Sequence, residues 1–267
     1  MPMETRMHLL LTTFFLMIFT ASLSAEPLKV DMGIGLWQHE TSGSITSTLN
    51  QTLYFKDNLS THKSRKNGYM YINIEHKVPI LPNLRLEYTN LTSDTNNIEI
   101  GAHSTFLPID LVARTNLVSS SLLMKQYDAI FFYNTLDEYT GITLDLGLDL
   151  KYLLIDYQID FLLNSSESSV IPLAYVRGRI DTKANIGFET DVKYITDGSA
   201  IVYELCFKVD YTMIFIPVVH PGIELGYKVE QFTSKGEDSA FIGAILSNKI
   251  DSDIGFSGFY GGITVEF

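Results

Sequence analysis

Cysteine is nearly absent from this chain, since Cys206 is the only one among 267 residues. An internal disulfide is therefore excluded, and the fold must be stable without covalent cross-links. Basic residues are also few: 19 lysines and arginines stand against 31 aspartates and glutamates, which gives a net charge of −12. Nucleic-acid phosphates attract basic surfaces, so this charge argues against a nucleic-acid partner.

Long hydrophobic runs are missing after Ala25. A transmembrane helix needs about 18 or more consecutive apolar residues, so membrane-spanning helices are excluded for that part of the chain. The earlier run Leu9–Phe19 is short for a bilayer span but suits the apolar centre of a signal peptide, with Arg6 before it and small residues after it. We therefore expect residues 1–25 to be a cleaved signal peptide and residues 26–267 to form one domain.

What the chain does have is alternation, because 46% of its residues are apolar and many recur at every second position. Residues 142–152 place Ile142, Leu144, Leu146, Leu148, Leu150 and Tyr152 on one side, and Thr143, Asp145, Gly147, Asp149 and Lys151 on the other. A period of two is typical of a β-strand with one apolar and one polar face. Residues 201–211, 223–229 and 259–267 repeat the pattern, and weaker copies bring the expected total to ten strands. Each would hold roughly ten residues, enough to cross the hydrocarbon layer when tilted.

The connections between these segments alternate in length. Long ones cover residues 39–67, 93–121, 158–170 and 233–254, and short ones cover 79–83, 137–140, 181–185 and 216–220. Residues 196–199 form a tight turn where a long loop is due. Long loops at one rim and short turns at the other are typical of outer-membrane barrels. We therefore predict an all-β fold, an antiparallel transmembrane up-and-down β-barrel of ten strands. Eight or twelve strands stay open, because residues 93–121 or 237–247 could hold strand extensions.

The apolar face of such a sheet can point to lipid or to the interior. A membrane barrel turns it outward, a soluble barrel of the lipocalin type turns it inward, and alternation alone does not separate the two. Three features favour lipid: the polar face carries charges of both signs, tyrosines lie near strand ends, and the last strand ends on Phe267. We therefore expect charged side chains, structural or pore-lining, to face the lumen. They are Arg85, Glu87, Asp145, Asp149, Lys151, Arg177, Arg179, Glu189, Asp191, Lys193, Glu204, Lys208, Glu224 and Lys228.

The final segment resembles the C-terminal insertion signal of bacterial outer-membrane barrels. Phe259, Ile263, Val265 and Phe267 fall in one alternating phase, although Gly261 replaces the apolar residue usual at its place. The resemblance implies that the barrel assembly machinery is a partner during insertion.

Internal stretches are similar to a family of uncharacterised proteobacterial outer-membrane β-barrel proteins. They are HKVPILPNLRLEYT at residues 76–89, GITLDLGL at residues 141–148 and GIELGY at residues 222–227, and Trp37-Gln38 after a glycine-rich first strand fits too. The similarity spans nearly the whole chain after the expected signal peptide and is weakest in the loops. It implies one barrel domain in the outer membrane of a Gram-negative bacterium, and it supplies no activity.

Catalysis would need a nucleophile and a base held at one point. His62 has Ser60 and Ser64 near it in sequence, and His103 adjoins Ser104, all within polar loops. The other histidines after the expected signal peptide are His39, His76 and His220. Adjacency in sequence does not create triad geometry, so we expect no catalytic residue and no cofactor.

Paired carboxylates have a structural and a chemical interpretation. Asp145 and Asp149 could form a hydrolase dyad, but a salt-bridged interior shared with Lys151 is the simpler interpretation. Asp251 and Asp253 could bind calcium weakly at the cell surface, although a solvated loop explains them as well. We therefore expect no metal site.

Surface contacts are the remaining source of function. The basic cluster Lys63, Arg65 and Lys66 could contact lipopolysaccharide phosphates, and residues 240–246 are apolar within the last loop. The expected partners are outer-membrane lipids and lipopolysaccharide, and the chain is expected to be a monomer. We expect a non-enzymatic, structural or surface-exposed barrel with a polar, largely plugged lumen, because small barrels are filled by side chains. A narrow pore for small solutes and an outer-membrane lipid hydrolase or acyltransferase stay open as alternatives.

Overall fold

The computed structural model describes most of the chain after residue 27. The described residues are 28–46, 52–54, 65–78, 80–98, 118–136, 141–159, 163–198, 200–214, 218–234 and 251–267. The expected signal peptide, residues 1–25, lies outside them. Every regular element within the described ranges is a β-strand. They contain no helix of the length and apolarity that a membrane span requires.

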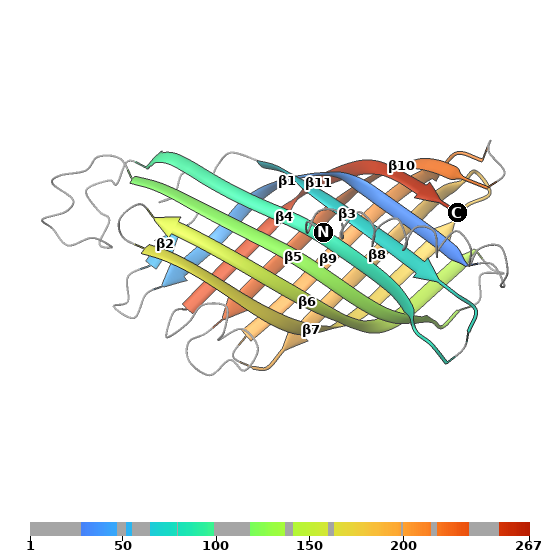
Figure 1. Ribbon diagram of the computed structural model, residues 1–267, viewed down its shortest axis with the longest axis horizontal. Coiled ribbons are helices and arrows are strands. Elements are labelled where there is room, and N and C mark those ends of the chain that lie inside the picture. The colour runs from blue at the N-terminus through green and yellow to red at the C-terminus, as the bar shows by residue number, and fades with distance from the viewer. Residues whose placement is uncertain are drawn as a thin grey trace, which may run out of the picture.

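Ten long strands and one short strand make up the described fold. They are β1 (Lys29–Thr46), β2 (Thr52–Tyr54), β3 (Arg65–Glu75), β4 (Asn83–Ile98), β5 (Val118–Asn134), β6 (Ile142–Ile159), β7 (Leu163–Asp181), β8 (Ile186–Thr196), β9 (Ala200–Thr212), β10 (His220–Ser234) and β11 (Asp251–Glu266). Each long strand pairs antiparallel with the next, and β11 pairs with β1, so the sheet closes into a barrel (Figure 1). The short β2 pairs with the end of β1. The predicted all-β, ten-stranded, antiparallel up-and-down barrel is therefore confirmed.

The seam between the first and last strands is long and regular. β1 and β11 pair without interruption over residues 31–46 and 251–266. At one end of the seam, the amide of Val30 donates to the carbonyl of Phe267 at 3.3 Å, and the amide of Phe267 donates back at 2.9 Å. A closed sheet leaves no row of unpaired backbone groups, which is the condition for β-structure in lipid.

The two rims of the barrel differ in their connections. β1 begins and β11 ends at the rim that holds the turns β3–β4, β5–β6, β7–β8 and β9–β10, which we call the short-turn rim. At the opposite rim the β8–β9 turn is tight. Gly198 has φ of +92°, a conformation that suits glycine, and the Ala200 amide donates to Asp197 Oδ1 at 2.8 Å. The predicted tight turn at residues 196–199 is therefore confirmed.

The strands are longer than the sequence predicts. Instead of roughly ten residues each, they hold 11 residues in β3 and β8 and as many as 19 in β7. The predicted long connection over residues 158–170 is wrong, because β6 runs to Ile159 and β7 begins at Leu163. The connections predicted over residues 39–67, 93–121 and 233–254 are also shorter than expected, since strands extend into them from both sides.

The extra length comes from an exchange of polarity along the strands. In β6 the inward Lys151 stands beside the outward Tyr152, as predicted for a charged lumen. Farther along the same strand, Leu153 and Ile155 are buried inside and Asp156 is exposed outside. The side chains still alternate between the inside and the outside of the barrel. In this part of the strand, however, the inward residues are apolar and the outward Asp156 is polar. The sequence prediction followed the apolar residues of the outward phase only. It therefore ended each strand where these residues stop, although the strand itself continues.

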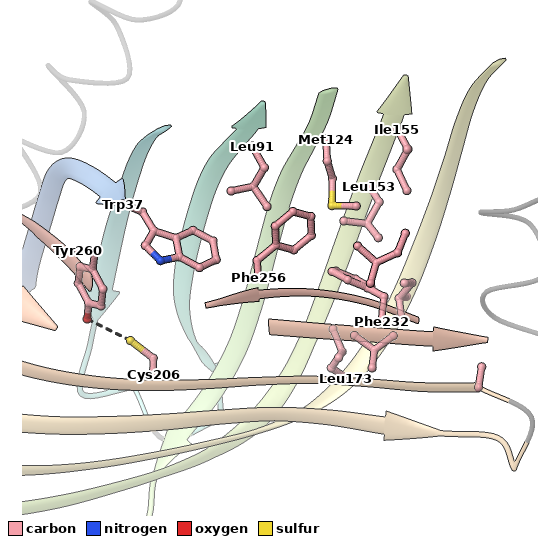
Figure 2. Packing of buried hydrophobic residues seen from close by; sticks show 14 residues of the cluster. Trp37, Leu91, Met124, Leu153, Ile155, Leu173, Cys206, Phe232, Phe256 and Tyr260 are labelled. Atoms are coloured by element: carbon pink, nitrogen blue, oxygen red, sulfur yellow. Dashed lines mark hydrogen bonds between the residues drawn. The ribbon is translucent and has the colours of Figure 1, made fainter. Parts of the chain in front are cut away.

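Two apolar regions result from this exchange. Nearer the short-turn rim, exposed apolar side chains cover the outside as an apolar belt: Ile34, Leu36, Met70, Leu86, Phe131, Leu146, Leu148, Leu150, Val176, Phe188, Leu205, Phe207, Leu225 and Ile263. Nearer the opposite rim, buried side chains fill the inside as an upper apolar cluster, which includes Trp37, Leu91, Met124, Leu153, Ile155, Ile171, Leu173, Phe232 and Phe256 (Figure 2). The barrel is therefore apolar outside at one level and apolar inside at the next.

Candidate functional site

The inward faces of the strands carry the charged side chains that the sequence predicts for the lumen. Each of them stands on the inward phase of its strand and is buried or half-buried. They lie on the strand segments whose outward residues form the apolar belt. We call this group the ionic lumen. Buried charges are tolerated when they are paired and hydrogen-bonded, so the contacts within the group decide what the lumen can do.

Glu204 on β9 is the centre of one cluster of ion pairs. Its carboxylate lies 3.0 Å from the Lys151 ammonium, 3.2 Å from that of Lys193 and 2.9 Å from that of Lys228. The three lysines come from β6, β8 and β10. One carboxylate therefore holds three cationic groups together in the middle of the barrel.

Two of these lysines connect strands that are not neighbours in the sheet. Lys151 on β6 is 3.0 Å from Asp128 on the adjacent β5, and also 3.0 Å from Glu230 on β10 across the lumen. Lys193 on β8 is 2.7 Å from Glu87 on β4. Side chains that reach across the interior in this way occupy the space through which a solute would pass.

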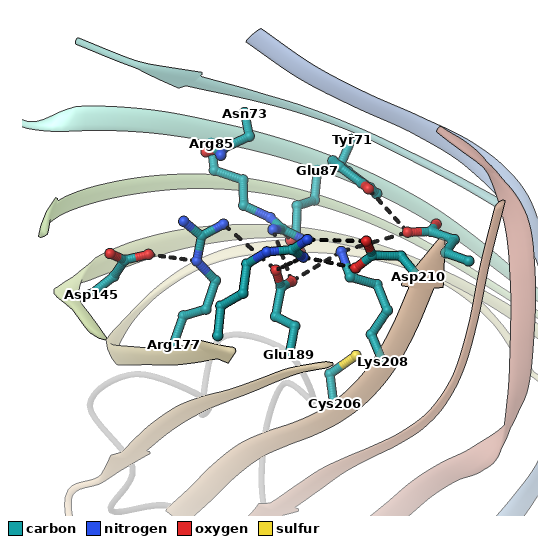
Figure 3. Close-up of polar contacts among 12 residues, drawn as sticks. Tyr71, Asn73, Arg85, Glu87, Asp145, Arg177, Glu189, Cys206, Lys208 and Asp210 are labelled. Carbon is teal, nitrogen blue, oxygen red and sulfur yellow. Dashed lines mark hydrogen bonds and ion pairs between the residues drawn. The ribbon is translucent and has the colours of Figure 1, made fainter. Parts of the chain in front are cut away.

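Glu189 on β8 is the centre of a second cluster, nearer the short-turn rim (Figure 3). Its carboxylate lies 3.5 Å from Arg85, 4.0 Å from Arg177, 3.2 Å from Arg179 and 3.0 Å from Lys208. These cations come from β4, β7 and β9. The cluster therefore joins two opposite walls of the barrel.

Tyrosines extend the ionic lumen toward β3. Tyr69 donates a hydrogen bond to one Glu224 oxygen at 2.5 Å, and Tyr71 donates to the other at 3.0 Å. The Arg85 guanidinium lies 4.6 Å from the centre of the Tyr71 ring, and the Lys208 ammonium lies 5.2 Å from it. Such cation–π contacts fix the ring between the two charges. Glu224 is thus held by side chains from β3 and by Lys208 at 3.6 Å.

The partners of the charges differ from those that their order in sequence suggests. Asp145 pairs with Arg177 at 2.5 Å rather than with Lys151 on its own strand. Asp149 lies 3.7 Å from Lys193. Both carboxylates are therefore held by cations of other strands. The arrangement is an ion-paired interior, and Asp145 and Asp149 take separate partners in it.

Several inward carboxylates were missing from the predicted set, among them Asp31, Glu75, Asp128, Asp210 and Glu230. They stand on the inward phase of their strands, so alternation could have found them. With them, nine carboxylates and five cationic side chains are buried inside the described barrel. The interior therefore carries more negative than positive groups.

The upper apolar cluster was also missing from the sequence prediction, which expected a polar lumen throughout. Trp37 donates its indole N–H to the Gly258 carbonyl at 3.2 Å and lies beneath the Lys228 ammonium, 5.2 Å from the ring centre. Cys206 and Tyr260 share a hydrogen bond of 3.0 Å at the border between the cluster and the charges (Figure 2). At the level of the belt the lumen is mainly ionic, with a small buried cluster of Ile130, Phe132 and Tyr175 among the charges. At the level above it the lumen is apolar, so the predicted polar lumen does not fit there.

At the short-turn rim the ionic lumen opens into a polar cavity of about 310 Å³, which we call the cup. Its outer wall includes Asp31, Asn73, Asp181 and Glu266, which stand close to the ends of their strands. Arg177, Glu189 and Lys208 line its inner end. The ion pairs around Glu189 therefore form the floor of the cup.

The histidines do not form a catalytic pair in the described part of the chain. His39 on β1 is buried and shares a 2.8 Å hydrogen bond with Asn67, and His76 lies 3.1 Å from the Pro82 carbonyl in the β3–β4 turn. His220 begins β10. The Ser–His pairs considered from the sequence involve Ser60, His62, Ser64, His103 and Ser104, which all lie outside the described residues.

The other candidate surface groups are only partly described. Asp253 on β11 is exposed and accepts hydrogen bonds from Gln231 and Thr233 of β10. Asp251 begins β11, and Arg65 and Lys66 begin β3. Lys63 and residues 240–246 lie outside the described residues. Within the described ranges, no group of three or more histidines, cysteines or carboxylates could hold a metal ion.

The residues of the suggested insertion signal form the outer face of β11. Phe259, Ile263 and Phe267 are exposed, and Val265 is half-buried. Tyr227 of β10 packs edge-on against Phe259, with ring centres 4.9 Å apart. The end of the last strand therefore presents apolar side chains to the surroundings of the barrel, with Gly261 between Phe259 and Ile263.

Comparisons with known proteins identify no family for this chain. No family model matches the sequence, and no curated protein matches it. The outer-membrane protease OmpT of Escherichia coli is 8% identical with a TM-score of 0.46, and the match covers 91% of this chain and 99% of OmpT. Ail, the attachment invasion locus protein of Yersinia pestis, is 9% identical with a TM-score of 0.39, and the match covers 90% of this chain and 99% of Ail. A major outer membrane protein of Thermus thermophilus is 12% identical with a TM-score of 0.39, and the match covers 91% of this chain and 100% of that protein. Similarities of this size say nothing about activity.

Proposed function

We propose that the protein is a monomeric outer-membrane β-barrel of a Gram-negative bacterium, with a closed lumen and a structural or surface-exposed role, and that it is not an enzyme. Three properties support the proposal: the apolar belt, the ion-paired lumen and the upper apolar cluster. Its partners are then outer-membrane lipids and lipopolysaccharide, together with the barrel assembly machinery, for which the exposed face of β11 is the expected contact.

The apolar belt supports placement in lipid. Its members are exposed on the outside of a closed sheet, and the charged side chains of the same strand segments face inward, which is the reverse of a soluble barrel. Aromatic residues mark one limit of the belt, because toward the opposite rim the outward Tyr127 is followed by Lys125 and the outward Tyr194 by Thr196. A ring of aromatic residues at a polarity boundary is typical of the membrane interface.

The contacts of Lys151 carry the proposal of a closed lumen. The Lys151 ammonium is fully buried and lies 3.0 Å from each of Asp128, Glu204 and Glu230. A hydrated ion could pass this level only after these pairs separated, and separating buried pairs is costly. A further void beside Trp37 and Tyr260 measures about 50 Å³, and a water molecule occupies about 30 Å³. The upper apolar cluster adds a second closed layer.

The decisive experiment is a conductance measurement on the purified, folded barrel in planar lipid bilayers. We expect insertion without steady current in concentrated KCl, whereas an open porin inserted under the same conditions serves as the positive control. A stable single-channel current would overturn the closed lumen and favour the narrow pore. In that case replacing Arg177 and Arg179 by glutamine should change the ion selectivity.

Placement and lack of enzymatic activity are tested separately. The processed protein should stay with the outer membrane after carbonate or urea washing, and extraction by these washes would contradict the membrane proposal. Purified protein should release no fatty acid from phospholipid or lipid A. Turnover that disappears on substitution of a single histidine or serine would support the hydrolase or acyltransferase alternative instead.

A further inference from the structure

We propose that the cup at the short-turn rim binds an elongated organic cation of the polyamine class. The side chains that line the cup include six carboxylates and four cationic groups. The proposal rests on how these groups are already paired, on the acceptors that remain and on the shape of the cavity.

The cationic groups of the cup are all engaged. Their ion pairs are Lys29 with Glu266 at 3.5 Å, Arg177 with Glu75 at 2.9 Å, Arg179 with Asp210 at 2.7 Å and with Asp181 at 2.8 Å, and Lys208 with Glu189 at 3.0 Å. An anionic ligand would have to break such pairs to gain a partner. The groups of the cup that remain available to a ligand are therefore mainly carboxylate oxygens.

Two acceptors on one wall have no donor in the described part of the molecule. Asp31 on β1 stands opposite Asn73 on β3 in the sheet register. Asn73 is 3% exposed, and its amide nitrogen donates to Glu75 at 2.8 Å, but its Oδ1 atom accepts no hydrogen bond. The Asp31 carboxylate also lines the cup. The positive charge of Lys208 attracts it, but among the described side chains none ion-pairs or hydrogen-bonds with it. A buried acceptor without a donor is costly, so this wall favours a ligand that brings donors.

The shape of the cup separates an organic cation from a single metal ion. The spare acceptors lie on β1 and β3, while further carboxylates stand on β7, β9 and β11 around the cavity. A metal ion reaches acceptors at one point only, whereas a chain of ammonium groups separated by methylenes can reach several walls. The volume of about 310 Å³ is at the lower end of the range of about 300–1,000 Å³ that is usual for small-molecule pockets. The floor around Glu189 makes the cup a blind pocket.

Calorimetric titration of spermidine into the folded barrel in an uncharged detergent tests the proposal. We expect saturable binding of one spermidine per chain. Asp31→Asn keeps the shape of the side chain but removes the spare charge, and it should weaken binding about ten-fold. The matched control is Glu40→Gln, because Glu40 lies on the same strand but is exposed on the outside, and the net charge changes by the same amount. It should leave binding unchanged.

Three results would overturn the proposal. They are an absence of saturable heat with spermidine, an equal loss of binding in Asp31→Asn and Glu40→Gln, and complete displacement of spermidine by magnesium chloride at matched ionic strength. The last two would show general attraction of cations to an acidic protein. Circular dichroism and heat-modifiable electrophoretic mobility confirm that each variant is folded. Binding in detergent does not depend on conductance or cellular location, so its failure would leave the proposed function untouched.

Discussion

The ring of Tyr71 lies directly against the backbone of Gly33 on the neighbouring strand. A β-carbon added to Gly33 would lie 2.3 Å from Tyr71 Cε1, far inside the contact distance of two carbon atoms. The glycine therefore lets the tyrosine lie flat on β1, where its hydroxyl reaches Glu224 and its ring faces Arg85. One missing side chain on β1 thus positions part of the ionic lumen.

Gly33→Ala should destabilise the barrel by about 1–3 kcal/mol, because the new methyl group overpacks the interior and displaces the Tyr71 ring. The measurement is the urea midpoint of unfolding in phospholipid vesicles. Gly68→Ala is the matched control, since a β-carbon at Gly68 meets no atom within 4 Å. Equal midpoints for the two variants would contradict the packing of Tyr71 on Gly33.

Glu204→Gln should cost about 3–5 kcal/mol of unfolding free energy, because three buried ammonium groups lose a shared carboxylate. Those groups are Lys151, Lys193 and Lys228. Chemical denaturation of the folded barrel measures the effect. Asp156→Asn removes the same charge from an exposed position on β6 and should cost less than about 0.5 kcal/mol. A Glu204→Gln variant as stable as this control would mean that the lumen is hydrated.

Leu148→Arg should cost about 2–4 kcal/mol, since Leu148 is an outward member of the apolar belt and a charge at mid-bilayer is unfavourable. Ser168→Arg places the same side chain at an exposed position of β7 beyond the belt, and it should be nearly neutral. Folding yield and unfolding midpoint in vesicles report both. If Ser168→Arg proved the more costly change, the assignment of the belt to lipid would be wrong.

Trp37 fluorescence should resist both acrylamide and brominated acyl chains. Trp37 is the only tryptophan of the chain and is 1% exposed, facing inward. Unfolding in urea should make it accessible to acrylamide. The double variant Trp37→Phe, Leu148→Trp moves the probe to the outer surface, where brominated lipid should quench it strongly. Quenching of the native Trp37 by brominated lipid would show that the phase of β1 is reversed.

Alternation in the sequence was enough to predict the barrel, because it records which face of a strand is outward. In β6 the run from Ile142 to Tyr152 has one phase, and the structure follows it. The prediction was wrong beyond Tyr152. There the apolar residues Leu153 and Ile155 stand on the inward phase, which the charged residues occupy earlier in the strand. An exchange of faces looks like the end of a strand when only one phase is followed.

The pairing inside the lumen was beyond the reach of the sequence. Lys151 and Glu204 lie on β6 and β9, with β7 and β8 between them in the sheet. Their contact depends on the curvature of the closed sheet and on strand register, and neither follows from local pattern. The residue types and their phase were predictable, whereas the clusters around Glu189 and Glu204 required the three-dimensional arrangement.

The seam between β1 and β11 has a consequence for biogenesis. The two strands come from opposite ends of the described chain, so their hydrogen bonds span the largest sequence separation in the barrel. Contacts of that separation are slow to form. Until β11 arrives, β1 and β10 remain exposed borders that can recruit foreign strands. Successful maturation therefore requires that something shield these two borders until the final strand docks. A polypeptide truncated before residue 251 would lack β11, so it would aggregate through these borders and would not close into a smaller barrel.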